Sequence, residues 1–227
     1  MASRANDQSP LLVRALDGAH DLVVATALRH VSSPGARALD LGAGSGALTK
    51  RLQNAGFRVT AADISNYFRL ETEFVQVDFN DPGFDRTLPG GVDLITSVEV
   101  IEHLENPTAF LRSIRRLLND NGVAILTTPN VENVPARLKF LLRGEVRAMD
   151  KHSPEHITPI HLDLFMRKIV PEGGLALIER FVYPKNGFPL TGRRRFVPFF
   201  HLLTPILKGP ALTGDSHFLV LKRARSG

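Results

Sequence analysis

A glycine-rich loop near the start of the chain is the feature that most limits what this sequence can fold into. It reads Asp40-Leu41-Gly42-Ala43-Gly44-Ser45-Gly46. The apolar run over residues 36–41 predicts a buried strand, and residues 47–55 have helical spacing with Gly56 as the stop signal. Glycines let the backbone turn sharply and approach a ligand closely. A strand, a glycine loop and a helix in this order are typical of nucleotide-type sites in α/β folds.

Predicted strands alternate with predicted helices along most of the chain. The pattern predicts further strands over 58–63, 74–77, 92–97, 123–128, 175–183 and 217–222, helices over 107–118 and 162–170, and a tight turn over 119–122. This alternation predicts an α/β, Rossmann-like fold with a seven-stranded, mostly parallel sheet and helices on both faces. The last strand is expected to run antiparallel, because no convincing helix precedes it. Only ten residues, 64–73, separate the second and third strands, so a helix there must be short or missing.

Length and composition favour one globular unit. The 227 residues suit a single domain over 1–227, with an N-terminal helical extension at 1–33 and substrate-side insertions at 129–160 and 184–215. The absence of cysteine excludes disulfides, thiolate metal sites and thiol catalysis. No signal-peptide pattern and no apolar run of about 18 residues is visible, so we expect a soluble, cytoplasmic protein.

Two acidic residues follow the strands next to the glycine loop. Asp63 ends the second strand, 17 residues after Gly46, and a carboxylate there can accept hydrogen bonds from two ribose hydroxyls. Asp78 follows the third strand and can accept from an exocyclic amino group, while Phe79 beside it can pack on an adenine ring. A dinucleotide enzyme is the rival interpretation, because the loop also fits that relaxed glycine pattern. Asp40 before the loop, the alternating glycines and the lack of a separate substrate domain count against it.

Several motifs together resemble those of class I methyltransferases that use S-adenosylmethionine (SAM). The matching segments are 38–46, 59–65, 75–79, 92–97 and 118–129. The resemblance is closest to the O-methyltransferases of ubiquinone biosynthesis. The short crossover between Asp63 and Asp78 departs from the family pattern. It implies SAM as the cofactor, with these residues as its site: Asp40, Gly42, Ala43, Gly44, Gly46, Asp63, Ile64, Asp78, Phe79 and Ser97.

A group of two carboxylates and an imidazole follows the fourth strand. Glu99, Glu102 and His103 share a face if residues 99–104 begin a helical turn, and they can then hold a divalent ion or supply a general base. The Glu-x-x-Glu-His pattern resembles the ubiquinone-type enzymes. It also resembles the methyltransferases of small-RNA ends, in which glutamates and histidines hold magnesium.

In the RNA-end enzymes a further histidine comes from a later loop. His152, His156 and His161 lie in that region here, and His156 is the preferred candidate. The predicted metal set is therefore Glu99, Glu102, His103 and His156. The alternative is that the glutamates cap and solvate a turn while His103 packs structurally.

Two long segments are expected to select the acceptor. Residues 130–159 predict a short amphipathic helix, either over the active site or packed on the surface. Residues 184–214 hold five cations and no acidic residue beside an apolar run, which suits an anionic membrane surface or a lipid-like acceptor. A substrate lid or a dimer contact explains the same pattern equally well.

The leading hypothesis is a SAM-dependent enzyme that methylates an oxygen, or less favourably a nitrogen, of a small or lipid-like acceptor, with Glu99, Glu102 and His103 as catalytic residues. The alternatives are metal-assisted ribose methylation of RNA ends and a non-catalytic SAM-binding adaptor. A net charge of +5, two tyrosines and no tryptophan do not favour nucleic acid as a partner. The sequence does not determine the oligomeric state.

Overall fold

A single sheet organises the computed structural model, which describes residues 11–32, 34–151, 153–185, 197–207, 209 and 211–224. Within that part of the chain, seven strands lie in the order β3-β2-β1-β4-β5-β7-β6. The strands are β1 (Arg37–Leu41), β2 (Arg58–Asp63), β3 (Phe74–Gln76), β4 (Val92–Val98), β5 (Leu118–Pro129), β6 (Leu175–Tyr183) and β7 (Ser216–Arg223). The first five pair in parallel, whereas β7 runs antiparallel between β5 and β6. The predicted fold class is confirmed.

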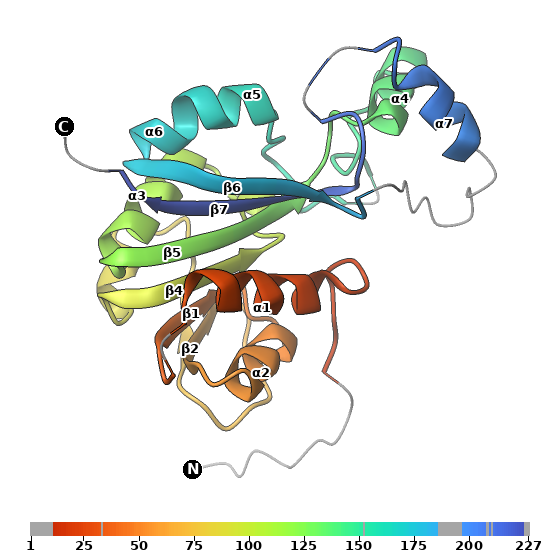
Figure 1. Ribbon diagram of the computed structural model, residues 1–227. Helices are drawn as coiled ribbons and strands as arrows, with labels where there is room; N and C mark the ends of the chain where they lie inside the picture. Colours follow the sequence, from red (N-terminus) through yellow and green to blue (C-terminus); the bar gives the residue numbers. More distant parts are fainter. Residues whose placement is uncertain are drawn as a thin grey trace.

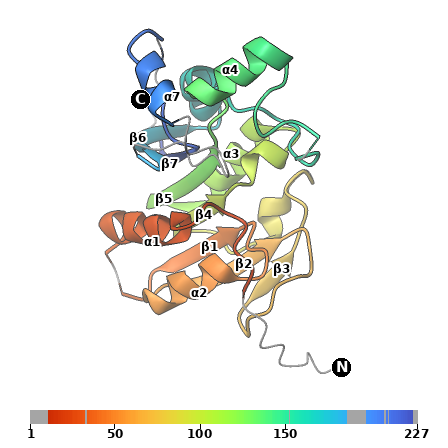
Figure 2. The same cartoon turned by 90° about the vertical axis from the view of Figure 1, so that its right-hand side faces the viewer.

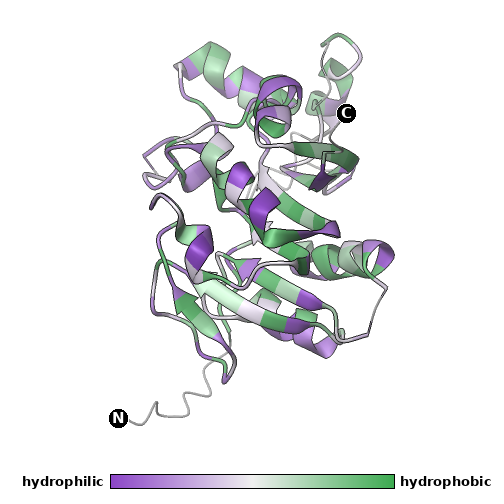
Figure 3. Cartoon of the chain, turned by 90° about the vertical axis from the view of Figure 1, so that its left-hand side faces the viewer, coloured by the Kyte–Doolittle hydropathy of each residue, from purple (hydrophilic) through white to green (hydrophobic). Residues whose placement is uncertain are grey.

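Helices cover both faces of the sheet (Figure 1). On one face, α1 (Ala19–His30) and α2 (Ala47–Asn54) share a buried apolar cluster with β5 and β7. On the other face, α3 (Pro107–Leu117) packs beside a helical stretch made of α5 (Leu162–Leu164), the π-helical η3 (Phe165–Ile169) and α6 (Val170–Glu172). The central strands between these layers are largely apolar (Figure 3).

The start and the buried face of α3 show how the sequence builds these layers. The side chain of Asn106 caps the helix by accepting a hydrogen bond from the Ala109 backbone N–H at 2.9 Å, and Pro107 occupies the first turn. Apolar residues at helical spacing then face the sheet, and Phe110, Leu111 and Ile114 are at most 1% exposed.

Three boundaries differ from the sequence pattern. Residues 11–18 are not helical, because α1 begins only after Gly18, whose φ is 77°. The tight turn expected at residues 119–122 lies inside β5, where the register with β4 shifts between Val92 and Leu94. The predicted helix over 162–170 continues to Glu172 through a π-helical turn. The crossover over 64–73 contains no helix, as its length predicted.

The carboxyl ends of the parallel strands meet at one edge of the sheet, and the segments outside the layers gather there. Residues 11–18 cross in front of this edge (Figure 2). The short helix η2 (Ile101–His103) follows β4, and α4 (Val134–Arg143) packs with α7 (Val197–Leu203) in a projecting lobe (Figures 1 and 2). None of the helices in the described ranges is long and apolar enough to cross a membrane.

Candidate active site

The glycine loop joins β1 to α2 at the carboxyl edge, and its three glycines have different surroundings. Gly42, Gly44 and Gly46 have φ angles of 85°, 53° and 98°, a region that side chains disfavour. A Cβ on Gly42 would lie 2.3 Å from Cγ2 of Val100, whereas a Cβ on Gly44 would meet nothing within 4 Å. Packing therefore requires a glycine at position 42, and the backbone at Gly44 borders open space that a ligand can approach.

The carboxylate of Asp63 points toward this loop. The backbone N–H of Gly44 donates to its Oδ2 at 2.8 Å, and the N–H and hydroxyl of Ser65 donate to Oδ1 at 2.8 and 2.6 Å. A carboxylate has about four acceptor positions, and these three donors leave one of them, on Oδ2, for a ligand hydroxyl. Ile64 beside it is 58% exposed, which presents an apolar side chain at the same edge.

Asp40 points into the fold instead. Its carboxylate is 1% exposed and accepts hydrogen bonds from the hydroxyls of Thr49 at 2.6 Å and Thr96 at 2.9 Å. Burial raises the pKa of Asp40 to about 6, and the two hydroxyls only partly offset that effect. This geometry assigns the Asp40 side chain to holding β1, α2 and β4 together below the loop.

Of the four remaining predicted cofactor positions, Ala43 is buried within the glycine loop, and the other three lie along the same edge. Asp78 is half-buried and accepts from the backbone N–H of Asn80 at 2.8 Å. The ring of Phe79 packs against Phe84 and Phe110, with centroids 5.2 and 5.7 Å away, so one side of it belongs to the core. Ser97, at the end of β4, is 1% exposed, and its hydroxyl has no hydrogen-bond partner among the described residues.

Glu99 has a strained backbone and a tightly held side chain. Its φ is 52°, an uncommon value for a residue with a side chain, and such strain concentrates at functional sites. Its Oε1 accepts hydrogen bonds from the hydroxyls of Thr127 at 2.9 Å and Ser216 at 3.1 Å. Burial raises the pKa of this carboxyl group.

Glu102 is buried with little compensation. It is fully buried on η2, and neither carboxylate oxygen has a hydrogen-bond partner in the described part of the chain. Burial and the nearby Glu99 carboxylate raise the pKa of Glu102 well above its usual value. An unpaired buried carboxyl group is costly, so this one has the properties expected of a ligand-binding or proton-transferring group.

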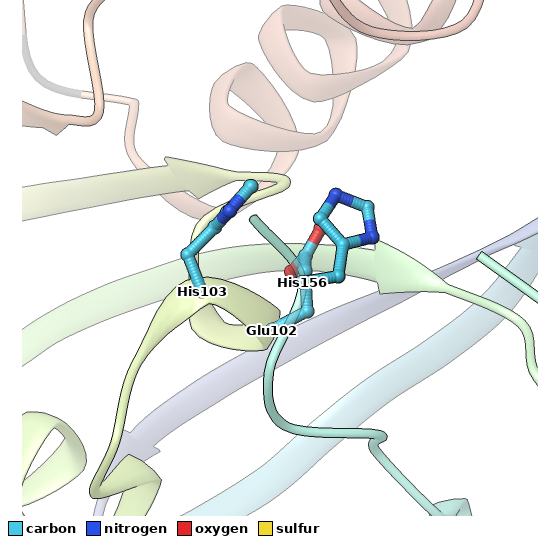
Figure 4. Close-up of side chains that lie close together, drawn as sticks. All are labelled: Glu102, His103 and His156. Carbon is cyan, nitrogen blue, oxygen red and sulfur yellow. The ribbon is translucent and has the colours of Figure 1, made fainter. Parts of the chain in front are cut away.

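Two histidines complete a cluster with Glu102 (Figure 4). The rings of His103 and His156 meet edge to face with centroids 4.5 Å apart. Nδ1 of His103 lies 3.1 Å from the carbonyl oxygen of Glu155, and Nδ1 of His156 lies 2.6 Å from that of Ala148. Carbonyl oxygens only accept, so we assign a proton to each Nδ1, which leaves the Nε2 lone pair of both rings for a ligand. Burial, reinforced by His156, lowers the pKa of His103 and favours its neutral form.

The ligand-forming atoms of Glu102, His103 and His156 all lie within 4.8 Å of one another. His156 reaches this position because the backbone N–H groups of Ile157 and Thr158 both donate to the carbonyl oxygen of Glu102, at 3.0 and 2.9 Å. Of the predicted four-residue metal set, the structure gathers these three.

The other candidates lie elsewhere. Glu99 is outside the group of three, because its Oε1 is bound to Thr127 and Ser216. His161 is 57% exposed and lies 3.8 Å from Glu132. His152 lies outside the described residues.

Sequence reasoning missed a second row of polar residues behind the cluster. Thr127 and Ser216 hold Glu99, while Thr128 and His217 face each other across β5 and β7 and are at most 1% exposed. Burial and the charge of Arg180 lower the pKa of His217 to about 4. These polar residues lie at the ends of strands on the site edge, and that position was a usable sequence signal. The antiparallel register of β5 and β7, which joins them, was not visible in the sequence.

Comparisons with known proteins identify the family of this chain. The sequence profile of the methyltransferase domain family matches residues 17–180. The chain belongs to the class I SAM-dependent methyltransferases. A ubiquinone biosynthesis O-methyltransferase of Xanthomonas campestris is 31% identical over 153 residues, which cover 60% of this chain and 63% of that protein. One of Nitrosococcus oceani is 30% identical over 181 residues, covering 73% of each chain.

Solved structures show the same fold at low sequence identity. An N1-methyltransferase for 1,6-didemethyltoxoflavin from Burkholderia thailandensis, solved with S-adenosylhomocysteine, has a TM-score of 0.60 at 14% identity, covering 91% of this chain and 79% of that one. A putative methyltransferase from Haloferax volcanii, solved with its Trm112 activator, has a TM-score of 0.60 at 19% identity, covering 94% of this chain and 100% of that one. The methyltransferase domain therefore keeps its sheet while its sequence diverges widely.

The buried carboxyl of Asp40 predicts a specific pH dependence of stability. Its folded-state pKa of about 6 lies above the usual 3.8, so the folded state binds more protons and the free energy of unfolding falls as pH rises between about 4 and 6. A difference of about two pKa units corresponds to about 3 kcal/mol. Asp40→Asn should remove this part of the decline, as measured by urea unfolding at pH 4 and pH 7.

The exposed Asp81 provides the matched control. Asp81→Asn should keep the wild-type decline, because an exposed carboxyl has similar surroundings in the folded and unfolded chain. An Asp40→Asn protein whose stability falls with pH as steeply as the wild type would contradict the assignment.

Proposed function

We propose that this methyltransferase transfers a methyl group from SAM to an oxygen, or less favourably a nitrogen, of a small or lipid-like acceptor. The observation that carries the proposal is the placement of two different sites along one sheet edge. The open glycine loop with Asp63 lies at β1 and β2, and the cluster of Glu102, His103 and His156 lies beyond β4. The relatives named as O-methyltransferases support oxygen as the accepting atom.

The residues on the loop side fit SAM. The open space at Gly44 lets a ligand approach the backbone, and the Asp63 carboxylate would hold a ribose hydroxyl. The exposed Ile64 would pack on the adenine ring, and Asp78 would accept from its amino group. When bound, the cofactor supplies an electrophilic methyl group on a sulfonium sulfur. These residues hold the donor in one orientation, which is how a site of this kind gains much of its rate.

The residues beyond β4 would prepare the acceptor. The neutral ring of His103 offers its Nε2 lone pair to an acceptor hydroxyl, and the raised pKa of Glu102 makes that carboxylate a stronger base when it is ionised. Glu99 would then act mainly by position, because Thr127 and Ser216 fix its carboxylate. Removal of the acceptor proton would leave the oxygen able to attack the methyl carbon in line, so that the C–O bond forms as the C–S bond breaks and S-adenosylhomocysteine leaves.

We further propose that a divalent cation binds between Glu102, His103 and His156. The unpaired oxygens of Glu102 and the two Nε2 lone pairs fit a cation that accepts one oxygen and two nitrogen ligands. This donor set suits zinc or manganese better than magnesium, which prefers oxygen. With the ion bound, these Nε2 lone pairs would coordinate it instead of acting as the base, and the ion would lower the pKa of the acceptor hydroxyl.

The projecting lobe supports a lipid-like acceptor. Large apolar side chains on and just after α4 and α7 are more than half exposed: Phe140 59%, Leu141 77%, Leu142 77%, Phe199 51%, Leu202 68% and Ile206 72%. The α4 sequence carries three cations and no carboxylate, and segment 184–214 adds five cations and no acidic residue. Of those five, Arg193, Arg194, Arg195 and Lys208 lie outside the described residues. We propose that this lobe contacts an anionic lipid surface from which the acceptor is drawn.

A cofactor-binding test follows from the open space at Gly44. Gly44→Val should weaken S-adenosylhomocysteine binding by about 100-fold or more, because the new side chain would fill space that the ligand needs. Calorimetry measures the affinity. Gly56→Val is the matched control, since Gly56 also has a positive φ of 94° and no atom within 4 Å of a Cβ, but it lies after α2, outside the glycine loop.

Both variants place a valine at a positive φ with open space around its Cβ, so a difference in affinity between them reports on the ligand. Equal affinity in Gly44→Val and the wild type would rule out this cofactor site. A wild type that binds the cofactor but methylates no acceptor would instead favour the non-catalytic adaptor, and turnover restricted to RNA ends would favour the ribose methyltransferase.

The metal proposal predicts that Glu102→Gln weakens binding of Mn²⁺ or Zn²⁺ by about tenfold or more, because the amide keeps the volume but loses the charged ligand. Glu105→Gln changes an exposed carboxylate on the neighbouring turn and should leave metal affinity unchanged. Calorimetry with each ion measures the affinities. Methyl transfer that persists fully in excess chelator would exclude an essential ion.

The lipid proposal predicts that the protein co-sediments with vesicles containing phosphatidylglycerol and less with pure phosphatidylcholine vesicles. Leu141→Glu with Leu142→Glu should abolish this binding, since two charges would enter the apolar contact. Leu28→Glu, on the 49%-exposed Leu28 of α1, is the control and should bind as the wild type does. A wild-type protein that remains in the supernatant with both vesicle types would refute the lipid contact.

A further inference from the structure

Two segments outside the sheet are both tied to the glycine loop through Ser45. The hydroxyl of Ser45 donates to the carbonyl oxygen of Leu12 at 3.1 Å, and its carbonyl oxygen accepts from the N–H of Arg69 at 3.3 Å. The first segment, residues 11–18, crosses the carboxyl edge and is called the strap here (Figure 2). The second is the helix-free crossover over residues 64–73.

The strap is held at its other end as well. The hydroxyl of Tyr183 donates to the carbonyl oxygen of Asp17 at 2.9 Å, just before Gly18 starts the turn into α1. The strap therefore runs from β6 across to the glycine loop with both ends fixed. Its middle carries Arg14, which has no carboxylate partner among the described residues, and its guanidinium lies over the ring of Tyr67 at 5.9 Å.

The crossover is folded down onto the same loop. Phe68 is 4% exposed and stacks on Phe74 with centroids 4.7 Å apart. A Cβ on Gly46 would lie 2.9 Å from Leu70 and 3.1 Å from Phe68, so these side chains pack directly against the loop. This anchoring fixes the backbone on both sides of position 67 and leaves the Tyr67 ring 62% exposed.

Among the mostly polar exposed residues of the crossover, two carry large apolar groups. Ile64 and Tyr67 are 58% and 62% exposed and follow Asp63, whose carboxylate contacts Gly44. A solvated aromatic ring gains contact area when a flat, apolar ligand surface covers it, and its electron-rich face also attracts a cation. Arg14 supplies such a cation for Tyr67, and a ligand at the nearby open glycine loop would supply the apolar surface.

We infer that Tyr67, positioned by Arg14, completes the adenosyl side of the cofactor site, in the place where a longer crossover would supply a helix. The strap and the crossover are then two walls of one site, and the Arg14–Tyr67 contact joins them. This inference rests on the proposed use of SAM. It concerns residues outside the predicted cofactor set, and it explains how the short crossover still provides a pocket.

The test is the affinity for S-adenosylhomocysteine in matched variants, measured by calorimetry. Tyr67→Ala and Arg14→Ala should each weaken binding by about fivefold, the effect expected for losing one partly exposed cation–π contact and its apolar area. Tyr67→Phe should bind as the wild type does, because the ring is retained, whereas Tyr67→Leu should bind as weakly as Tyr67→Ala. Arg58→Ala, at the opposite end of the sheet, is the charge-matched control.

Proteolysis supplies a second readout that does not depend on turnover. Trypsin cleaves after Arg14, and bound S-adenosylhomocysteine should slow that cleavage in the wild type but much less in Tyr67→Ala. Without ligand, the melting temperatures of Tyr67→Ala and Arg14→Ala should equal that of the wild type, since the side chains of Tyr67 and Arg14 are both exposed.

The outcomes separate this inference from the function on which it rests. A wild type that does not bind S-adenosylhomocysteine would sink both. A wild type that binds, with Tyr67→Ala binding equally well and no ligand protection after Arg14, would overturn the role of Tyr67 and leave the glycine-loop site intact. A loss in Tyr67→Phe as large as in Tyr67→Ala would also overturn it, because the hydroxyl rather than the ring would then be responsible.

Discussion

The buried carboxylate of Asp40 is the contact on which the rest of the site depends. It joins the end of β1 to Thr49 on α2 and Thr96 on β4, so three elements are fixed around the loop that starts two residues later. Hydrogen bonds to a charged group in a dry interior are stronger than those between neutral groups, and leaving that group unpaired would be costly. The loop can therefore keep three glycines at positive φ and an open face without losing its shape.

Beyond the loop, some polar groups at the carboxyl edge of the sheet have hydrogen-bond partners, and others have none among the described residues. The carboxylates of Asp63 and Glu99 are held by defined donors, which gives them fixed positions. Glu102 has none among the described residues, although it is fully buried. A fold tolerates such a group only where a ligand or a proton compensates for its burial, and the two histidine lone pairs beside it indicate where that ligand would lie.

The carboxyl edge also explains where the exposed apolar lobe of α4 and α7 lies. The antiparallel β7 inserts between β5 and the edge strand β6, so the segment before it reaches the carboxyl edge and lies beside the segment after β5. Side-chain amides of Asn130 and Asn133 join the two segments by donating to the carbonyl oxygen of Gly214 at 3.1 and 2.8 Å. The exposed apolar lobe of α4 and α7 is thus attached at the carboxyl edge, next to the proposed acceptor site.

The sequence by itself determined the sheet class, the glycine loop, the missing crossover helix and the carboxylate at the end of β2. These features depend on local periodicity, on the φ angles that only glycine adopts readily, and on the rule that parallel strands share a carboxyl edge. Only the tertiary structure decided that the Asp40 carboxylate points inward, that His156 rather than His161 joins His103, and that Arg14 meets Tyr67. The physical reason is that these contacts join residues far apart in the chain, such as His103 and Glu155 at a separation of 52, and their geometry is fixed by strand register and backbone hydrogen bonds that no local pattern encodes.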